Sequence, residues 1–477
     1  MSTHETHRTG TARPAAHQER PGGAERSART ARAVAHQVGE RLRDPQHVAE
    51  TAGRAFATAP ADLLLPGWQP ASVLLGHAGI ALLHIVRARH EPDWSSVAHA
   101  HLAAAVRSAP SVGPAGAGDL ILPALLHARL TGGYAKLLAR STELATAHTA
   151  AAIAALDARL TENGPGLSYL DYDVIAGLAG RGRALLAAAG SGDERVAAVL
   201  SDLLRLLVRL TRPTEVRGRE VPGWWCAPER YVVDRDRLAY PSGDFNLGAA
   251  HGICGPLSLL ALAHRAGVVV PGGSEAIRSV TDWLLARELT DATGAYWPAR
   301  IPYEEETGQA VGTGAATPRA GWCYGASGIA WSLHLAGHAL ADPAVGARAR
   351  DAMRAAVTRP LPSTMADDPG LCHGRAGVLH TAVRMAAATG DPVLWAAADR
   401  AAAELAAAFD EDAPFGYRQH VPTGTGPRYL DSPALIDGAT GAALALAGYA
   451  DARAEPDGAG EPDWASEPDW DAALLLT

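Results

Sequence analysis

The chain has 477 residues, of which 48% are hydrophobic and 19% are charged, and its net charge is −9. This composition is sufficient for a large apolar core and excludes an intrinsically disordered protein, and the lack of a basic cluster argues against a nucleic-acid partner. No apolar run reaches the roughly 18 residues of a transmembrane helix, the polar N-terminus lacks the apolar segment of a signal peptide, and four cysteines are too few for a disulfide scaffold. We therefore expect a soluble, cytoplasmic protein.

The two ends of the chain differ in composition from the rest. Residues 1–30 mix polar residues, Gly and Pro without periodicity, which predicts a disordered arm. Residues 452–477 contain Glu-Pro-Asp three times, and Trp464 and Trp470 follow the last two copies. We interpret this segment as a flexible acidic tail; the alternative is that its tryptophans dock on a partner. The folded domain is expected to span residues 31–451.

Two kinds of helix are expected in the domain. Ser191–Glu194 has the pattern of a capping box, and the residues up to Leu210 then place apolar side chains on one face and charged ones opposite. Residues 255–263 and 441–447 are instead apolar nearly all round. Such helices must be covered on every side, so the alternation predicts two concentric layers of helices.

An internal repeat supports this architecture. Gly-x-x-Gly followed by a small or apolar helix start recurs seven times, 37 to 75 residues apart, at Gly76, Gly113, Gly177, Gly252, Gly325, Gly374 and Gly438. Each interval has room for one helical hairpin and a loop. The sequence therefore predicts an all-α fold, a closed seven-fold α/α toroid.

Long loops precede several copies of the motif. The stretches 212–250, 291–322 and 410–436 each lead into an inner helix, so we expect them at one mouth of the toroid. They hold many of the aromatic residues: Trp224, Trp225, Tyr231, Tyr240, Phe245, Tyr296, Trp297 and Tyr303. These rings are expected either to form a substrate-binding rim or only to pin the loops down, and some loops to form short strands.

The positions just before each first glycine carry candidate chemistry. They are Ala250-His251, Cys323-Tyr324, Cys372-His373 and Ile436-Asp437 in the later copies. Equivalent positions of a toroid converge on its axis, so these side chains are expected to meet. Two thiolates and one imidazole form a catalytic zinc site with one open position. The alternative is that these cysteines are buried fillers, the role favoured for Cys226 and Cys254.

Four blocks resemble the lanthionine synthetase C family: Tyr172-Asp-Val-Ile-Ala-Gly177, Ala250-His-Gly-Ile-Cys-Gly-Pro256, Gly321-Trp-Cys-Tyr-Gly325 and Leu371-Cys-His-Gly374. The order matches, and the last two together are specific to that family. The resemblance implies a zinc-dependent cyclase. It would add a Cys thiol to dehydroalanine or dehydrobutyrine in a dehydrated precursor peptide, which forms lanthionine or methyllanthionine. A dehydratase and an exporter are the implied partners.

The resemblance also assigns roles to individual residues. It makes Cys323, Cys372 and His373 ligands of one Zn²⁺, and His251 the catalytic histidine. It makes Asp173 the acidic partner of the histidine, although a helix cap is the alternative role. Tyr324 and Arg319 are expected near the metal, where either one could stabilise an enolate oxygen.

Other functions remain open at this stage. The same site would serve an enzyme that adds glutathione to dehydroamino acids in proteins. A protein prenyltransferase β subunit also activates a thiol on zinc, but the Cys-His-Gly block argues against it. A peptide-binding scaffold with structural zinc belongs to a different class, and His251 and the open coordination position argue against it.

Overall fold

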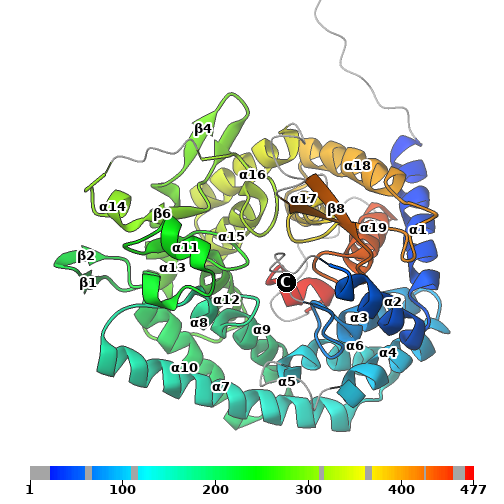
Figure 1. Ribbon diagram of the computed structural model, residues 1–477, viewed down its shortest axis with the longest axis horizontal. Coiled ribbons are helices and arrows are strands. Elements are labelled where there is room, and N and C mark those ends of the chain that lie inside the picture. The colour runs from blue at the N-terminus through cyan, green and yellow to red at the C-terminus, as the bar shows by residue number, and fades with distance from the viewer. Residues whose placement is uncertain are drawn as a thin grey trace, which may run out of the picture.

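The computed structural model describes residues 22–59, 67–108, 116–310, 316–359, 368–423, 426–454 and 468–477. In these residues the helices form two concentric rings (Figure 1). The inner ring consists of α3 (His77–Ala88), α6 (Ile121–Thr131), α9 (Leu178–Ala188), α12 (Cys254–Arg265), α15 (Ala326–Ala339), α17 (Arg375–Thr389) and α19 (Ala439–Ala454). The outer ring consists of α1 (Gly23–Arg41), α4 (Trp94–Ser108), α7 (Ala135–Asn163), α10 (Glu194–Leu210), α13 (Gly273–Leu285), α16 (Pro343–Thr358) and α18 (Pro392–Ala407). The predicted seven-fold α/α toroid is confirmed.

The polarity of the helices explains the layer in which each one lies. Every residue of α12 from Cys254 to Ala263 is buried, as an inner helix requires. In α10 the face that carries Val196, Leu200 and Leu203 is buried and the opposite face is exposed. The predicted helix is thus confirmed, but its cap is Asp193, whose side chain accepts a hydrogen bond from the backbone N–H of Arg195, and not the expected Ser191.

The second glycine of the repeated motif permits close packing at the start of the inner helices. A Cβ at Gly79, Gly180, Gly328, Gly377 or Gly441 would overlap the carbonyl oxygen of the residue six positions earlier. The loop therefore folds back directly onto the first turn of its helix. In the second copy, residues 113–115 lie outside the described residues, and α6 there follows the short helix α5 (Gly116–Asp119).

A series of backbone hydrogen bonds joins the loops that precede the inner helices. The N–H of one loop donates to a carbonyl oxygen of the next. The donors and acceptors are repeat-equivalent in Ala250→Cys323, Cys323→Cys372, Cys372→Ile436 and Ile436→Leu74, and Val174, one position earlier in its repeat, donates to Ala250; the N···O distances are 2.9 to 3.4 Å. The ring closes where α1 packs against α19. This network holds the repeat-equivalent positions together around the axis.

The described loops contain four two-stranded antiparallel sheets, as the expectation of short strands anticipated. They are β1 (Thr214–Val216) with β2 (Arg219–Val221), β3 (Asp244–Asn246) with β6 (Arg300–Pro302), β4 (Leu289–Asp291) with β5 (Gly294–Tyr296), and β7 (Gln419–Thr423) with β8 (Gly426–Leu430). The hairpins β1–β2 and β4–β5 lie at the periphery (Figure 1), the latter against α16. The remaining helices are α2 (Pro45–Ala57), α8 (Tyr169–Tyr172), α11 (Asp234–Ala239) and α14 (Tyr303–Glu306).

Most of the aromatic rings in these loops are core residues. Trp224, Trp225, Tyr231, Phe245, Trp297 and Tyr303 are all buried. Trp297, for example, donates its indole N–H to the carbonyl oxygen of Leu284 on α13. Of the two expected roles, pinning the loops down is therefore the correct one for these six rings.

Both predicted ends of the folded domain need correction. Helix α1 begins at Gly23, inside the expected disordered arm, and residues 1–21 lie outside the described residues. Residues 468–477 include a 3₁₀ helix, Trp470–Leu474, and are buried in the ring rather than forming a flexible tail; Trp464 lies outside the described residues. No helix among the described residues is long and apolar enough to cross a membrane.

Candidate metal and catalytic site

Cys323, Cys372 and His373 form one cluster at the start of α15 and α17. Their ligand atoms all lie within 4.8 Å of one another. Bonds of about 2.0–2.3 Å at tetrahedral angles place zinc ligands roughly 3.3–3.8 Å apart, so small side-chain adjustments suffice. Two sulfurs and one imidazole are also the donors that zinc prefers. The three residues therefore fit a zinc ion, and no other such group of His, Cys, Asp and Glu occurs among the described residues.

The electrostatics of the cluster favour one thiolate even before a metal binds. A hydrogen bond from Cys372 lowers the pKa of Cys323 well below its usual value, and the same bond raises the pKa of Cys372. Burial acts to lower the pKa of His373, but its hydrogen bond to Cys323 and the negative charge of that thiolate outweigh burial and raise the pKa to about 9. The cluster thus holds anionic sulfur, the form that ligates metal.

Asp173 has two roles at once. Its Oδ1 accepts hydrogen bonds from the backbone N–H groups of Ala176 and Gly177 at 2.8 and 2.6 Å, which holds the loop that leads into α9. Its Oδ2 lies 2.6 Å from His251 Nδ1. The fully buried carboxylate is therefore the expected acidic partner, but it is not a helix cap, because both N–H groups that it binds precede Leu178, the first residue of α9. Because Asp173 holds Nδ1, Nε2 is the nitrogen of His251 that remains for other contacts.

His251 and the metal cluster line the same pocket, which has a volume of about 380 Å³. The His251 side chain is 30% exposed, so the imidazole is accessible from the pocket. Arg319 and Tyr324 line this pocket too. The structure thus brings six of the seven predicted site residues to one cavity, and the seventh, Asp173, contacts it through His251.

Tyr324 is held from a neighbouring sheet. Its hydroxyl accepts a hydrogen bond of 3.1 Å from Asn246 Nδ2 on β3 and a further one from Arg300 on β6. Burial raises the pKa of Tyr324, so the hydroxyl remains protonated at neutral pH. Arg300 in turn forms ion pairs with Asp236 at 2.9 Å and Asp244 at 3.6 Å.

Two charged residues near the site were given no role in the sequence analysis. Asp437 lines the pocket at the repeat position of His373, and burial raises the pKa of its carboxyl to about 7. Its place in the repeat was the available signal. The sequence carried no comparable signal for Arg300, because this residue reaches Tyr324 from a loop strand outside the repeated motif.

The other two cysteines lie apart from the metal cluster. Cys226 is buried, with its sulfur 3.4 Å from the Tyr172 hydroxyl, and burial raises its pKa. Cys254 is buried on α12, and burial raises its pKa to about 12. Neither belongs to the cluster, as expected for buried fillers.

Comparison with known proteins identifies the relatives of this chain. The family described as lanthionine synthetase C-like protein matches residues 67–456. The nisin biosynthesis protein NisC of Lactococcus lactis subsp. lactis is 27% identical over 209 residues, which are 44% of this chain and 48% of NisC. The match thus spans about half the length of that relative. The solved structure of a nisin cyclase superposes with a TM-score of 0.69 at 20% identity, over 90% of this chain and 96% of the other, and confirms the fold.

Proposed function

Since the chain belongs to the lanthionine synthetase C-like family, we propose that it is a zinc-dependent cyclase acting on a dehydrated precursor peptide. The reaction adds a Cys thiol of the peptide across the double bond of dehydroalanine or dehydrobutyrine and so forms a thioether ring. The observation that carries this proposal is the shared pocket, in which the Cys323–Cys372–His373 cluster and His251, held by Asp173, face one cavity.

Cys323, Cys372 and His373 would hold the zinc ion, which when bound lowers the pKa of a coordinated substrate thiol so that it is a thiolate at neutral pH. Three protein ligands leave a fourth coordination position open. The exposed side of His373 and Cys372 toward the pocket is where the peptide thiol would enter.

His251 is assigned to proton transfer. Nδ1–H donates to Asp173, so Nε2 can take the proton of the incoming thiol. The sulfur then forms a bond to the β-carbon, and the π electrons of the double bond move to give an enolate. Return of the proton from Nε2 to the α-carbon completes the addition, and no atom is gained or lost.

Arg319 and Tyr324 are assigned to the enolate oxygen. Arg319 lines the pocket, and its guanidinium group carries several N–H donors. Tyr324 keeps its proton because burial raises its pKa, so it can donate a hydrogen bond to developing negative charge. Arg300 and Asn246 act through Tyr324 and are positioning residues.

The test uses a synthetic peptide that contains one dehydroalanine and one cysteine. Ring closure leaves the mass unchanged but removes the free thiol, so alkylation with N-ethylmaleimide followed by mass spectrometry distinguishes ring from open peptide. We expect the alkylated product to disappear with wild-type protein and to persist with His251→Ala. Addition of glutathione to the peptide in preference to its own cysteine would instead show the alternative activity. No loss of thiol with the zinc-loaded protein on any such peptide would contradict catalysis.

A further inference from the structure

Residues 468–477, which we call the bore segment, fill the interior of the ring. Figure 1 shows the segment inside the ring, and its 3₁₀ helix contacts α3, α6 and α9. Trp470, Leu474, Leu475 and Leu476 are each only 2% exposed, and Asp471 is fully buried. A stretch with the composition of an acidic tail therefore forms part of the core.

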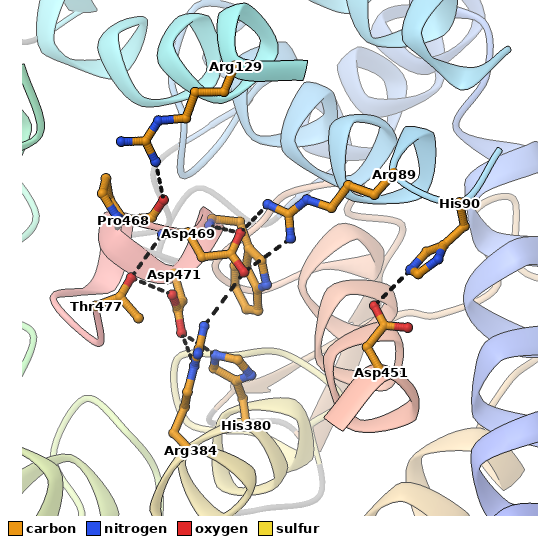
Figure 2. Close-up of polar contacts among 11 residues, drawn as sticks. Arg89, His90, Arg129, His380, Arg384, Asp451, Pro468, Asp469, Asp471 and Thr477 are labelled. Carbon is orange, nitrogen blue, oxygen red and sulfur yellow. Dashed lines mark hydrogen bonds and ion pairs between the residues drawn. The ribbon is translucent and has the colours of Figure 1, made fainter. Parts of the chain in front are cut away.

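Asp471 ties the bore segment to α17. Its Oδ2 accepts hydrogen bonds from His380 Nε2 at 2.6 Å and from Arg384 Nε at 2.7 Å, and its Oδ1 accepts one from the Thr477 hydroxyl at 2.7 Å (Figure 2). The His380 ring also packs against Trp470, with ring centroids 4.4 Å apart.

Cationic side chains on other inner helices hold the segment from the opposite side. Arg89, which ends α3, pairs with Asp469 at 2.7 Å. Arg183 of α9 donates from Nε to the Thr477 carbonyl oxygen at 2.5 Å, and Arg129 of α6 donates to the Pro468 carbonyl oxygen at 3.5 Å. The segment therefore bridges α17 to α3, α6 and α9 across the bore.

The bore segment lies at the end of the bore away from the metal cluster. The cluster precedes the inner helices, whereas Arg89 and Arg129 lie at the ends of theirs. A cavity of about 80 Å³ separates the two regions. Leu74 and Ile175 line both this cavity and the 380 Å³ pocket, and Ala472 and Ala473 of the segment line its far side. The segment thus forms the floor beneath the site.

We propose that the bore is a peptide-binding site whose occupant is the bore segment. The site takes a peptide with acidic residues followed by an aliphatic run: arginines and His380 receive the two aspartates, and the apolar bore receives the three leucines. Occupancy closes the far end of the ring, so the metal pocket opens at one mouth only. This proposal does not depend on the proposed activity.

The first test keeps the whole chain during folding. A protease recognition sequence is inserted within residues 455–467, the folded protein is cut and passed through gel filtration, and native mass spectrometry then detects retained fragment. We expect the wild-type fragment to stay bound and the fragment of Asp471→Ala to be lost. Asp202→Ala, which removes an exposed aspartate paired with Arg205 on α10, is the matched control and should retain it. Loss of the wild-type fragment as complete as that of Asp471→Ala would overturn the proposal.

The second test measures binding and closure. A fluorescein-labelled peptide of residues 468–477 is titrated into the emptied ring, and we expect saturable binding that Asp471→Asn weakens at least tenfold. For closure, Ala187→Cys places a thiol in the 80 Å³ cavity. Polyethylene glycol maleimide should modify this thiol at least tenfold faster after the segment is removed. The protein without the Ala187→Cys substitution measures the background modification of the native cysteines. Equal rates before and after removal would contradict closure.

Discussion

The two ends of the bore carry the same pair of residues in different surroundings. His251 and Asp173 at the metal end, and His380 and Asp471 at the far end, are both 2.6 Å apart. His251 is 30% exposed and lines a pocket, whereas the His380 side chain is only 3% exposed. The first pair is therefore accessible to a molecule in the pocket, whereas the second is enclosed by the bore segment and α17.

Electrostatic partners sharpen this difference. Burial alone would raise the pKa of Asp471, but its cationic partners Arg384 and His380 hold that pKa well below its usual range. Burial lowers the pKa of His380 despite the carboxylate beside it. A short histidine–carboxylate distance is therefore insufficient to identify a catalytic pair. Exposure to a pocket and the presence of other reactive groups decide its role.

Exchanging each histidine for alanine should separate the two pairs most clearly. His251→Ala is expected to lower the turnover number about 10²–10⁴-fold because it removes the proton-transfer group. Its unfolding temperature should fall less than that of His380→Ala, because the His251 side chain is 30% exposed and water in the pocket can reach the Asp173 oxygen that it leaves. His380→Ala should show the reverse, a lower unfolding temperature with turnover within a few fold of wild type when assayed below that temperature. Equal losses of turnover in both variants would contradict the distinction.

Loss of Asp471 should have the largest effect on stability. Asp471→Ala leaves the buried Arg384 and His380 without their shared acceptor, and breaking such a pair costs about 3–5 kcal/mol. Urea unfolding followed by circular dichroism measures this cost against Asp202→Ala, an exposed aspartate that should cost less than about 1 kcal/mol. A cost for Asp471→Ala no larger than that of the control would show that the bore segment contributes little to the fold.

Asp173→Asn tests whether the carboxylate at the metal end acts through His251. We expect turnover to fall roughly 10–100-fold, the range typical of groups that orient a functional histidine. The amide oxygen can still accept from the N–H groups of Ala176 and Gly177, so the loop before α9 and the unfolding temperature should be preserved. A large loss of stability without a change in turnover would show that Asp173 only holds the loop before α9.

A buried histidine pair on α3 and α4 should make stability depend on pH. Burial lowers the pKa of His77 to about 3 and that of His101 to about 4, from 6.5, and their Nδ1 atoms lie 3.0 Å apart. The unfolded chain therefore binds more protons below pH 6.5. The stability from these groups is fully present above pH 6.5 and is lost as the pH falls toward 4, by up to about 1.4 kcal/mol per pH unit for each group. Urea unfolding at pH 7 and at pH 5 measures how much the free energy of unfolding falls between the two. The fall should be smaller in His77→Gln, which lacks one of the two titrating groups.

The sequence allowed the fold and most of the site to be predicted because the repeat carries both. Equivalent positions before each inner helix are joined by backbone hydrogen bonds, so Cys323, Cys372 and His251 could be placed together without coordinates. The zinc assignment itself came from the resemblance as well as from this convergence. The structure adds that Asp173 holds both the loop before α9 and His251.

What could not be predicted depends on contacts between segments outside the repeat. Arg300 reaches Tyr324 only because β6 pairs with β3. The bore segment finds its partners far away in the chain, with His380 and Asp471 separated by 91 residues. The composition of this segment predicted a solvated tail. Acidic residues and an aliphatic run have the same composition whether they lie in solvent or are bound by arginines inside a ring. Such pairing is a property of tertiary structure.

The most direct test of the central assignment is the metal content of the purified protein. Inductively coupled plasma mass spectrometry should find about one zinc per chain in the wild type and little in Cys372→Ala. Cys254→Ala, which alters a buried cysteine apart from the cluster, should retain the zinc. Freshly purified wild-type protein without zinc, but with its helical circular dichroism intact, would contradict the assignment of Cys323, Cys372 and His373 as zinc ligands.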